Sequence, residues 1–78
     1  MADDFPSLKA RELLKVLTGQ LGYSVARQKG SHRRLKSAEG YPPLTFAFHD
    51  GQSLAPGLVR DVLVKQVGLE PDEALKLL

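Results

Sequence analysis

The sequence predicts a small two-layer α+β domain with the element order α-β-β-β-α and a short helix after it. Two amphipathic helical patterns enclose three short segments with the alternation typical of strands. Short turns between these segments imply an antiparallel three-stranded sheet, and both apolar helix faces must then pack on one side of it. We expect the 78 residues to form a single domain, 1–78, with one sheet face open to solvent.

The first helix is predicted over 7–21. Residues 1–6 are expected to form a flexible arm, and Ser7 is placed to cap the helix through its hydroxyl group. Apolar residues then recur at three- and four-residue spacing up to Leu21, and Gly22 is expected to end the helix.

Strands are predicted at 23–28, 32–37 and 44–49. Gly30, with Ser31, is a plausible hairpin turn because glycine tolerates a positive φ. The two prolines of the loop 38–43 exclude that loop from a ladder. These features make the first two strands a hairpin.

The second helix is predicted over 56–67, because proline fits the first helical turn at Pro56 and Gly68 ends the apolar periodicity. A short helix, 71–77, follows from Pro71. Its early acidic residues favour the positive end of a helix dipole.

Positive charge is concentrated in one part of the chain. Residues 23–38 contain five Lys/Arg and no Asp/Glu, a charge of +5; the rest contains six Lys/Arg and nine Asp/Glu, a charge of −3, which together give +2. Such a cluster attracts phosphate, and the histidine within it can exchange protons near neutral pH. Binding or cleavage of RNA is the chemistry that this combination favours.

Composition argues against several other classes of protein. The chain has no cysteine and two histidines, so neither a disulfide framework nor a metal site is expected. Its N-terminus is acidic, and no apolar run exceeds three residues, so neither a secretory signal nor a membrane segment is expected. We therefore expect a cytoplasmic protein without a cofactor.

Strand alternation predicts which side chains share the open face. Leu35 is the only large apolar residue of the second strand and is expected to face the helices. The opposite face then carries His32, Arg34 and Lys36, unless a bulge near the turn reverses His32. Alternation along 44–49 places His49 on the same open face.

This face suits metal-independent cleavage of RNA, in which the ribose 2′-hydroxyl attacks the neighbouring phosphate. His32 would act as general base or acid, with Lys29, Arg33 or Arg34 holding phosphate. His49 is the candidate second proton carrier, or it only positions the substrate. DNA lacks the 2′-hydroxyl group and should therefore resist cleavage.

Other interpretations of the same residues stay open. A histidine beside a turn is commonly an ordinary surface residue, and a basic hairpin commonly binds without chemistry. His49 can equally cap the turn that follows it. The alternatives to an endoribonuclease are therefore a non-catalytic RNA-binding module that uses the same basic face, and an interaction protein whose nuclease activity has been lost.

The sequence resembles the HicA family of toxins, the small mRNA interferases of toxin–antitoxin modules, from about Leu8 to Leu75. The most specific match begins at Gly22-Tyr23 and Arg27 and continues through Lys29-Gly30-Ser31-His32. A second match, Leu54-Ala55-Pro56-Gly57-Leu58, leads through Arg60, Val62 and Leu63 to Gly68-Leu69, and His49 matches a second family histidine. The sequence departs from the family pattern at Ala47, where relatives commonly have proline, in the proline-rich loop 38–43, and at Leu58, where relatives often have threonine.

The resemblance implies a double-stranded-RNA-binding-domain-like fold and endonuclease activity on mRNA, with His32 as the catalytic histidine. The residues expected to bind RNA are Arg27, Lys29, Ser31, Arg33, Arg34 and Lys36. The resemblance also implies an antitoxin of the HicB type that masks the histidine. Because such partners often carry the DNA-binding segment, no direct DNA binding is expected of this chain.

Overall fold

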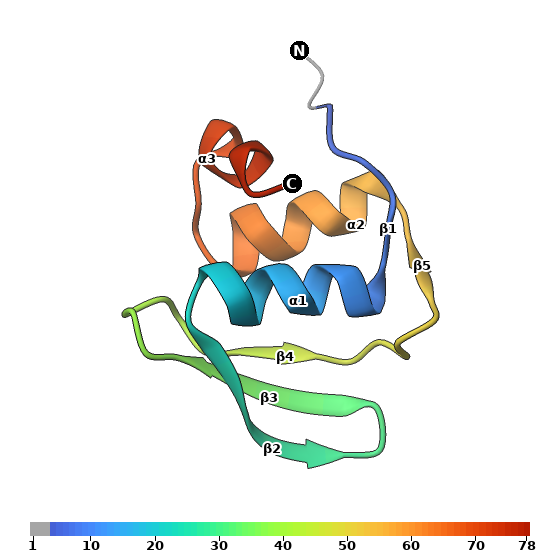
Figure 1. The fold of residues 1–78 in the computed structure, drawn as a ribbon, viewed down its shortest axis with the longest axis vertical. Helices are drawn as coiled ribbons and strands as arrows, with labels where there is room; N and C mark the ends of the chain where they lie inside the picture. Colours follow the sequence, from blue (N-terminus) through green and yellow to red (C-terminus); the bar gives the residue numbers. More distant parts are fainter. Residues whose placement is uncertain (1–3) are drawn as a thin grey trace.

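The computed structural model describes residues 4–78 and confirms the predicted α+β class. A three-stranded antiparallel sheet with the strand order β2-β3-β4 lies beneath a layer of helices, consistent with a double-stranded-RNA-binding-domain-like fold (Figure 1). In chain order the elements are β1 (Leu8–Lys9), α1 (Ala10–Gln20), β2 (Tyr23–Lys29), β3 (His32–Ser37), β4 (Leu44–Phe46), β5 (Ser53–Leu54), α2 (Pro56–Arg60), η1 (Asp61–Gln66) and α3 (Pro71–Lys76).

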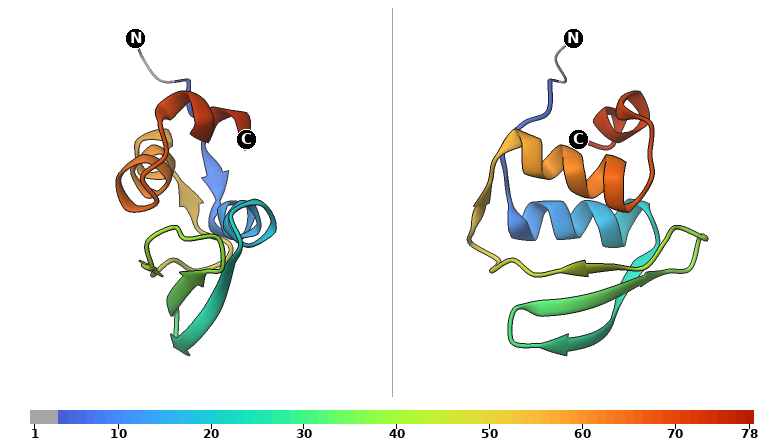
Figure 2. Two further views of the ribbon diagram at one scale, coloured as in Figure 1. Left: turned by 90° about the vertical axis from the view of Figure 1, so that its left-hand side faces the viewer. Right: turned by 180° about the vertical axis from the view of Figure 1, so that it is seen from behind.

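The core lies between the sheet and the helices, which run side by side on one side of it (Figures 1 and 2). Its largest fully buried side chains are Phe46, Leu13, Leu17, Leu35, Leu54, Leu63, Val59 and Val62. The β2–β3 hairpin extends beyond the helices, so Val25 is 44% exposed although it pairs with the buried Leu35. The outer face of the sheet is left open.

The predicted start of the first helix at Ser7 is wrong, because the chain is still extended there. Leu8 and Lys9 form β1, which pairs with β5, and the Ser7 hydroxyl donates to the carbonyl oxygen of Leu54 at 3.0 Å. The helix begins at Ala10, whose N–H donates to the Gln52 carbonyl oxygen at 2.8 Å. A partner distant in sequence therefore satisfies a helix-start N–H group that Ser7 was expected to serve.

The predicted flexible arm, 1–6, is wrong at Phe5. This ring is 5% exposed and belongs to the core, because burial of an aromatic side chain stabilises the fold. Residues 1–3 of the predicted arm lie outside the described residues.

The third strand of the sheet is shorter than the predicted 44–49. β4 ends at Phe46, which lies opposite Arg33 near the start of β3. The antiparallel register would place the residues after Ala47 opposite the Gly30–Ser31 turn, where β3 offers no backbone to pair with. The chain instead turns at 49–52, where the Gln52 N–H donates to the His49 carbonyl oxygen at 2.9 Å.

The second helix begins at Pro56 as α2 and continues as the π-helical segment η1 up to Gln66. Gly68, with a φ of 94°, follows its end. Within residues 4–78, no helix combines the length and the apolar character needed to cross a membrane.

Candidate nucleic-acid interface

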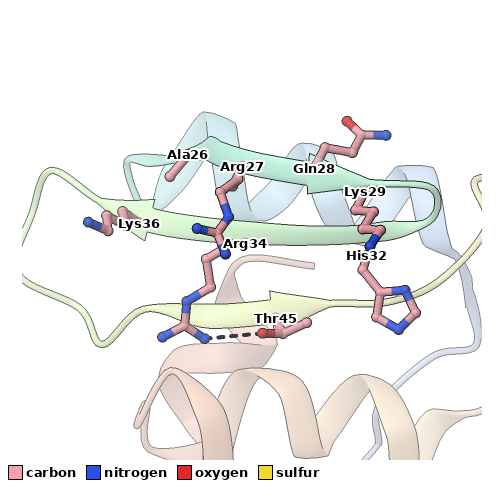
Figure 3. Close-up of a pocket in the computed structure, with 8 residues that line it drawn as sticks. All are labelled: Ala26, Arg27, Gln28, Lys29, His32, Arg34, Lys36 and Thr45. Carbon is pink, nitrogen blue, oxygen red and sulfur yellow. Dashed lines mark hydrogen bonds between the residues drawn. The ribbon is translucent and has the colours of Figure 1, made fainter.

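An open groove of about 530 Å³ runs along the outer face of the β2–β3 hairpin (Figure 3). Its lining contains four cationic side chains and one imidazole, and no carboxylate. The lining residues are Ala26, Arg27, Gln28, Lys29, His32, Arg34, Lys36 and Thr45. A surface of this charge is attractive to the phosphates of a nucleic acid strand.

A β-bulge at Ala26 brings the cations of the two strands onto one face. Val25 pairs with Leu35 and Arg27 pairs with Arg34, so Ala26 is an extra residue without a counterpart on β3. Strict alternation from Val25 would have placed Arg27 on the inner face, and the bulge reverses this. Lys29 follows Arg27 by two residues and shares its face.

His32 lies at one end of the groove, beside the hairpin turn. It is exposed, and its partner across the ladder is Lys29 (Figure 3). The turn contains Gly30, whose φ of 62° favours glycine, and the Gln28 side-chain amide donates to the Gly30 carbonyl oxygen at 3.0 Å. The local sequence therefore fixes the point at which the imidazole enters the groove.

Arg34 is oriented by a contact across the sheet. Its Nη1 donates to the Thr45 hydroxyl oxygen at 3.1 Å, and the two residues are paired on the outer face of β3 and β4. The other donors of the planar guanidinium are available to two oxygen atoms of a phosphate group. Thr45 was not predicted as a site residue, although strand alternation already placed it on the open face.

Two of the predicted RNA-binding residues do not line the groove. Arg33 lies on the inner face, where its Nη2 contacts Asp50 Oδ1 at 2.7 Å and its side chain is only 13% exposed. Ser31 is half-buried in the hairpin turn. The groove brings His32 together with the remaining predicted residues, which are Arg27, Lys29, Arg34 and Lys36.

His49 is exposed but also lies outside the groove lining. The alternation that was expected to place it beside His32 stops at Phe46, where β4 ends. Its N–H instead faces the Gln52 side-chain oxygen at 3.4 Å, within the turn at 49–52. This geometry agrees with the turn interpretation of His49.

No group of three or more His, Cys, Asp or Glu side chains suited to a metal ion occurs among residues 4–78. The groove lining itself supplies one imidazole and four fixed cations. Proton transfer and stabilisation of a negatively charged phosphate are the steps that these groups can support.

A family model described as the HicA toxin of bacterial toxin–antitoxin systems matches residues 10–69, most of the chain. This chain belongs to the HicA toxin family. The match includes every residue that lines the groove of this HicA protein. No curated protein and no solved structure matches the chain. Membership identifies the HicA chain as the toxin of a toxin–antitoxin module, which implies an antitoxin partner.

Proposed function

We propose that this HicA protein is an endoribonuclease that cleaves mRNA, with His32 as general base or general acid. The observation that carries the proposal is the position of His32 at the end of a groove with four cations and no carboxylate. A phosphate bound beside Lys29 would lie next to the only imidazole of the groove lining. The toxin family, in which growth inhibition is the expected outcome, supports the same conclusion.

The proposed reaction is an internal transesterification. The 2′-oxygen forms a bond to phosphorus while the bond from phosphorus to the 5′-oxygen breaks, which leaves a 2′,3′-cyclic phosphate and a 5′-hydroxyl group. A base removes the 2′-hydroxyl proton and an acid supplies a proton to the 5′-oxygen. The guanidinium of Arg34 would stabilise the charge that develops on the phosphate oxygens. None of these steps requires a metal ion.

The second proton carrier is a separate part of the proposal. His49 remains a candidate, although it lies outside the groove lining. Lys29 is the other candidate, because it is the direct cross-strand neighbour of His32. Comparing His49→Ala with Lys29→Ala separates them, because loss of the proton carrier lowers kcat, whereas loss of a phosphate contact mainly raises KM.

We further propose that the protein acts in the cytoplasm and is held inactive there by an antitoxin of the HicB type. An acidic surface on this partner would complement the groove and exclude RNA from His32. The cations of the groove, from Arg27 to Lys36, are then shared by substrate and antitoxin. No direct DNA binding by this chain is proposed.

The deciding experiment compares the wild type with His32→Ala on purified RNA in the presence of a chelator. We expect cleavage by the wild type, none by the variant, and no cleavage of a DNA strand of the same sequence. Lys65→Ala provides the control, because it removes an exposed charge of η1 that lies outside the groove lining. Equal cleavage by the wild type and His32→Ala would refute the assignment of His32.

A second candidate function is a non-catalytic RNA-binding module. It is favoured by the ratio of four cations to one imidazole in the groove, which phosphate binding alone would explain. RNA binding without cleavage by both proteins would support it. Expression in cells provides an independent check, because only a nuclease predicts slower growth that His32→Ala relieves.

A further inference from the structure

The groove side chains form an ordered series along the hairpin rather than a ring around His32. The ladder pairs Lys29 with His32, Arg27 with Arg34, and Ser24 with Lys36. Outward-facing residues recur every second position along a strand, so His32, Arg34 and Lys36 follow one another at about 7 Å. Figure 3 shows Lys29 and His32 at one end, Lys36 at the other, and both arginines between them.

The imidazole is therefore at the end of the cationic series. Next to it the chain turns at Gly30 and Ser31, and neither residue carries a charge. Arg33, the nearest remaining cation in the sequence, is turned to the inner face and paired with Asp50. Among the described residues, one cation that lines the groove, Lys29, lies opposite His32. The other cations of the lining lie between His32 and the end of β3 that carries Lys36.

We propose that the groove holds its RNA strand on one side of the cleaved phosphate only. The inference rests on the proposed function, because His32 marks the cleaved position. The cleaved phosphate lies at the Lys29–His32 end, and the next two phosphates of the same strand lie over the two arginines and over Lys36. Nucleotides beyond the other side of the cleaved phosphate extend past the turn without a groove contact.

The chemistry of the groove indicates a single strand held by its backbone. In-line attack requires the reacting nucleotide to leave the stacked helical geometry, and an open sheet face permits this. Grooves that track a single strand combine such cations with aromatic platforms for the bases. Here no aromatic side chain lines the groove, so the number of phosphates rather than the base sequence is expected to determine affinity.

The test uses 2′-O-methyl RNA strands with one unmodified ribonucleotide, so that only one bond can be cleaved. One series adds nucleotides on the 5′ side of that bond and a second series adds them on the 3′ side. We expect kcat/KM to rise by roughly three- to fivefold, the effect of an exposed ion pair, for each of two added phosphates in one series. The other series should remain flat.

Lys36→Ala tests the far end of the series. It should remove the gain from the second added phosphate and reduce the slope of log K against log salt by about 0.7, the value for one single-strand phosphate contact. Lys65→Ala is the matched control, because Lys65 is an exposed lysine of η1 that is paired with Asp61. This variant should reproduce the wild-type length profile.

Equal gains in both series, or a gain unaffected by Lys36→Ala, would overturn the proposal while leaving cleavage at His32 intact. Failure of the proposed function is separately visible, because the shortest strand would then not be cleaved or would be cleaved equally by His32→Ala. Binding of 2′-O-methyl RNA strands, which lack the attacking hydroxyl group, tests the cationic series in that case too. The slope of log K against log salt should become more negative with strand length, down to about −2, the value for three single-strand phosphate contacts. A slope that becomes steeper still for longer strands would refute the proposal.

Discussion

The Arg33 guanidinium donates to the Asp50 carboxylate at 2.7 Å and so joins the start of β3 to the loop that follows β4. The pair lies on the face of the sheet opposite the groove, because Arg33 directly follows His32 on β3 and neighbouring side chains of a strand point to opposite faces. Arg33 is 13% exposed, and its Nη1 is buried without a hydrogen-bond partner. The loop carboxylate is thus the residue that compensates a largely buried charge.

We expect Asp50→Asn to destabilise the fold by about 1–2 kcal/mol, because the guanidinium loses its charged acceptor while it remains largely buried. Urea denaturation measures this change. Asp61→Asn is the control, because Asp61 faces Lys65 in an exposed i,i+4 pair and its removal should cost less than about 0.5 kcal/mol. The combined variant Arg33→Met/Asp50→Asn should recover part of the free energy of unfolding that Asp50→Asn loses. If the effects of the two substitutions on stability simply add, this account is contradicted.

Glycine is required at position 22 by backbone geometry. Its φ is 71°, and a Cβ atom there would lie 2.8 Å from Cγ of Glu39. We expect Gly22→Ala to lower the free energy of unfolding by about 1–2 kcal/mol, mainly through the left-handed backbone. Gly19→Ala is the matched control within α1, because a Cβ atom at this position would meet no other part of the fold within 4 Å. This substitution should raise the free energy of unfolding by about 0.5–1 kcal/mol. Denaturation midpoints that shift in the same direction would be inconsistent with this prediction.

Tyr23 makes stability sensitive to alkaline pH. Burial raises the pKa of its hydroxyl group above the ordinary value of 10.0, and the neighbouring Tyr41 adds to the effect. The folded state therefore keeps this proton more tightly than the unfolded state. Its contribution is complete below about pH 10 and is lost as pH rises through the folded pKa.

Tyr23→Phe should consequently lose less stability than the wild type between pH 9 and pH 11, as measured by urea denaturation at each pH. At neutral pH the variant should be the less stable protein, because it lacks the hydrogen bond from the Tyr23 hydroxyl to the Pro42 carbonyl oxygen at 2.6 Å. Parallel pH profiles for the two proteins would show that Tyr23 does not carry the effect.

Deletion of Ala26 should leave RNA binding within a few-fold of the wild type. Because Ala26 is the unpaired residue of the bulge, its loss keeps Val25 opposite Leu35 and Arg27 opposite Arg34. Deletion of Gln28, a paired residue, should instead turn Lys29 inward or break the ladder and weaken binding about tenfold or more. Fluorescence anisotropy with a labelled RNA compares the two, and equal losses would argue against the bulge as the cause of the common face.

The sequence predicted the elements that local patterns determine. Leu35 alternates with polar residues along β3, and Gly22 and Gly68 mark the ends of helices, so these features follow from short-range geometry. The pairing of β1 with β5 could not be predicted in the same way, because each strand has two residues and depends on contacts more than forty positions apart. Phe5 is buried for the same long-range reason.

The candidate site shows the same division. Alternation along one strand was sufficient to group His32 with Arg34 and Lys36. The inward position of Arg33 follows from the same alternation, but its partner Asp50 lies in a loop whose path depends on where β4 ends. For that reason the expected position of His49 beside His32, which required β4 to continue, is not confirmed, and His49 lies outside the groove lining.

β2 is an edge strand, and an exposed edge is a template for pairing with a further copy of the same chain. The bulge at Ala26 interrupts that template, and Arg27 and Lys29 repel an identical edge. The charges that we propose to bind RNA thus also oppose aggregation. Neutral residues at Arg27 and Lys29 would therefore leave a strand edge prone to self-association, whereas replacement of His32, the proposed catalytic residue, would leave this protection in place.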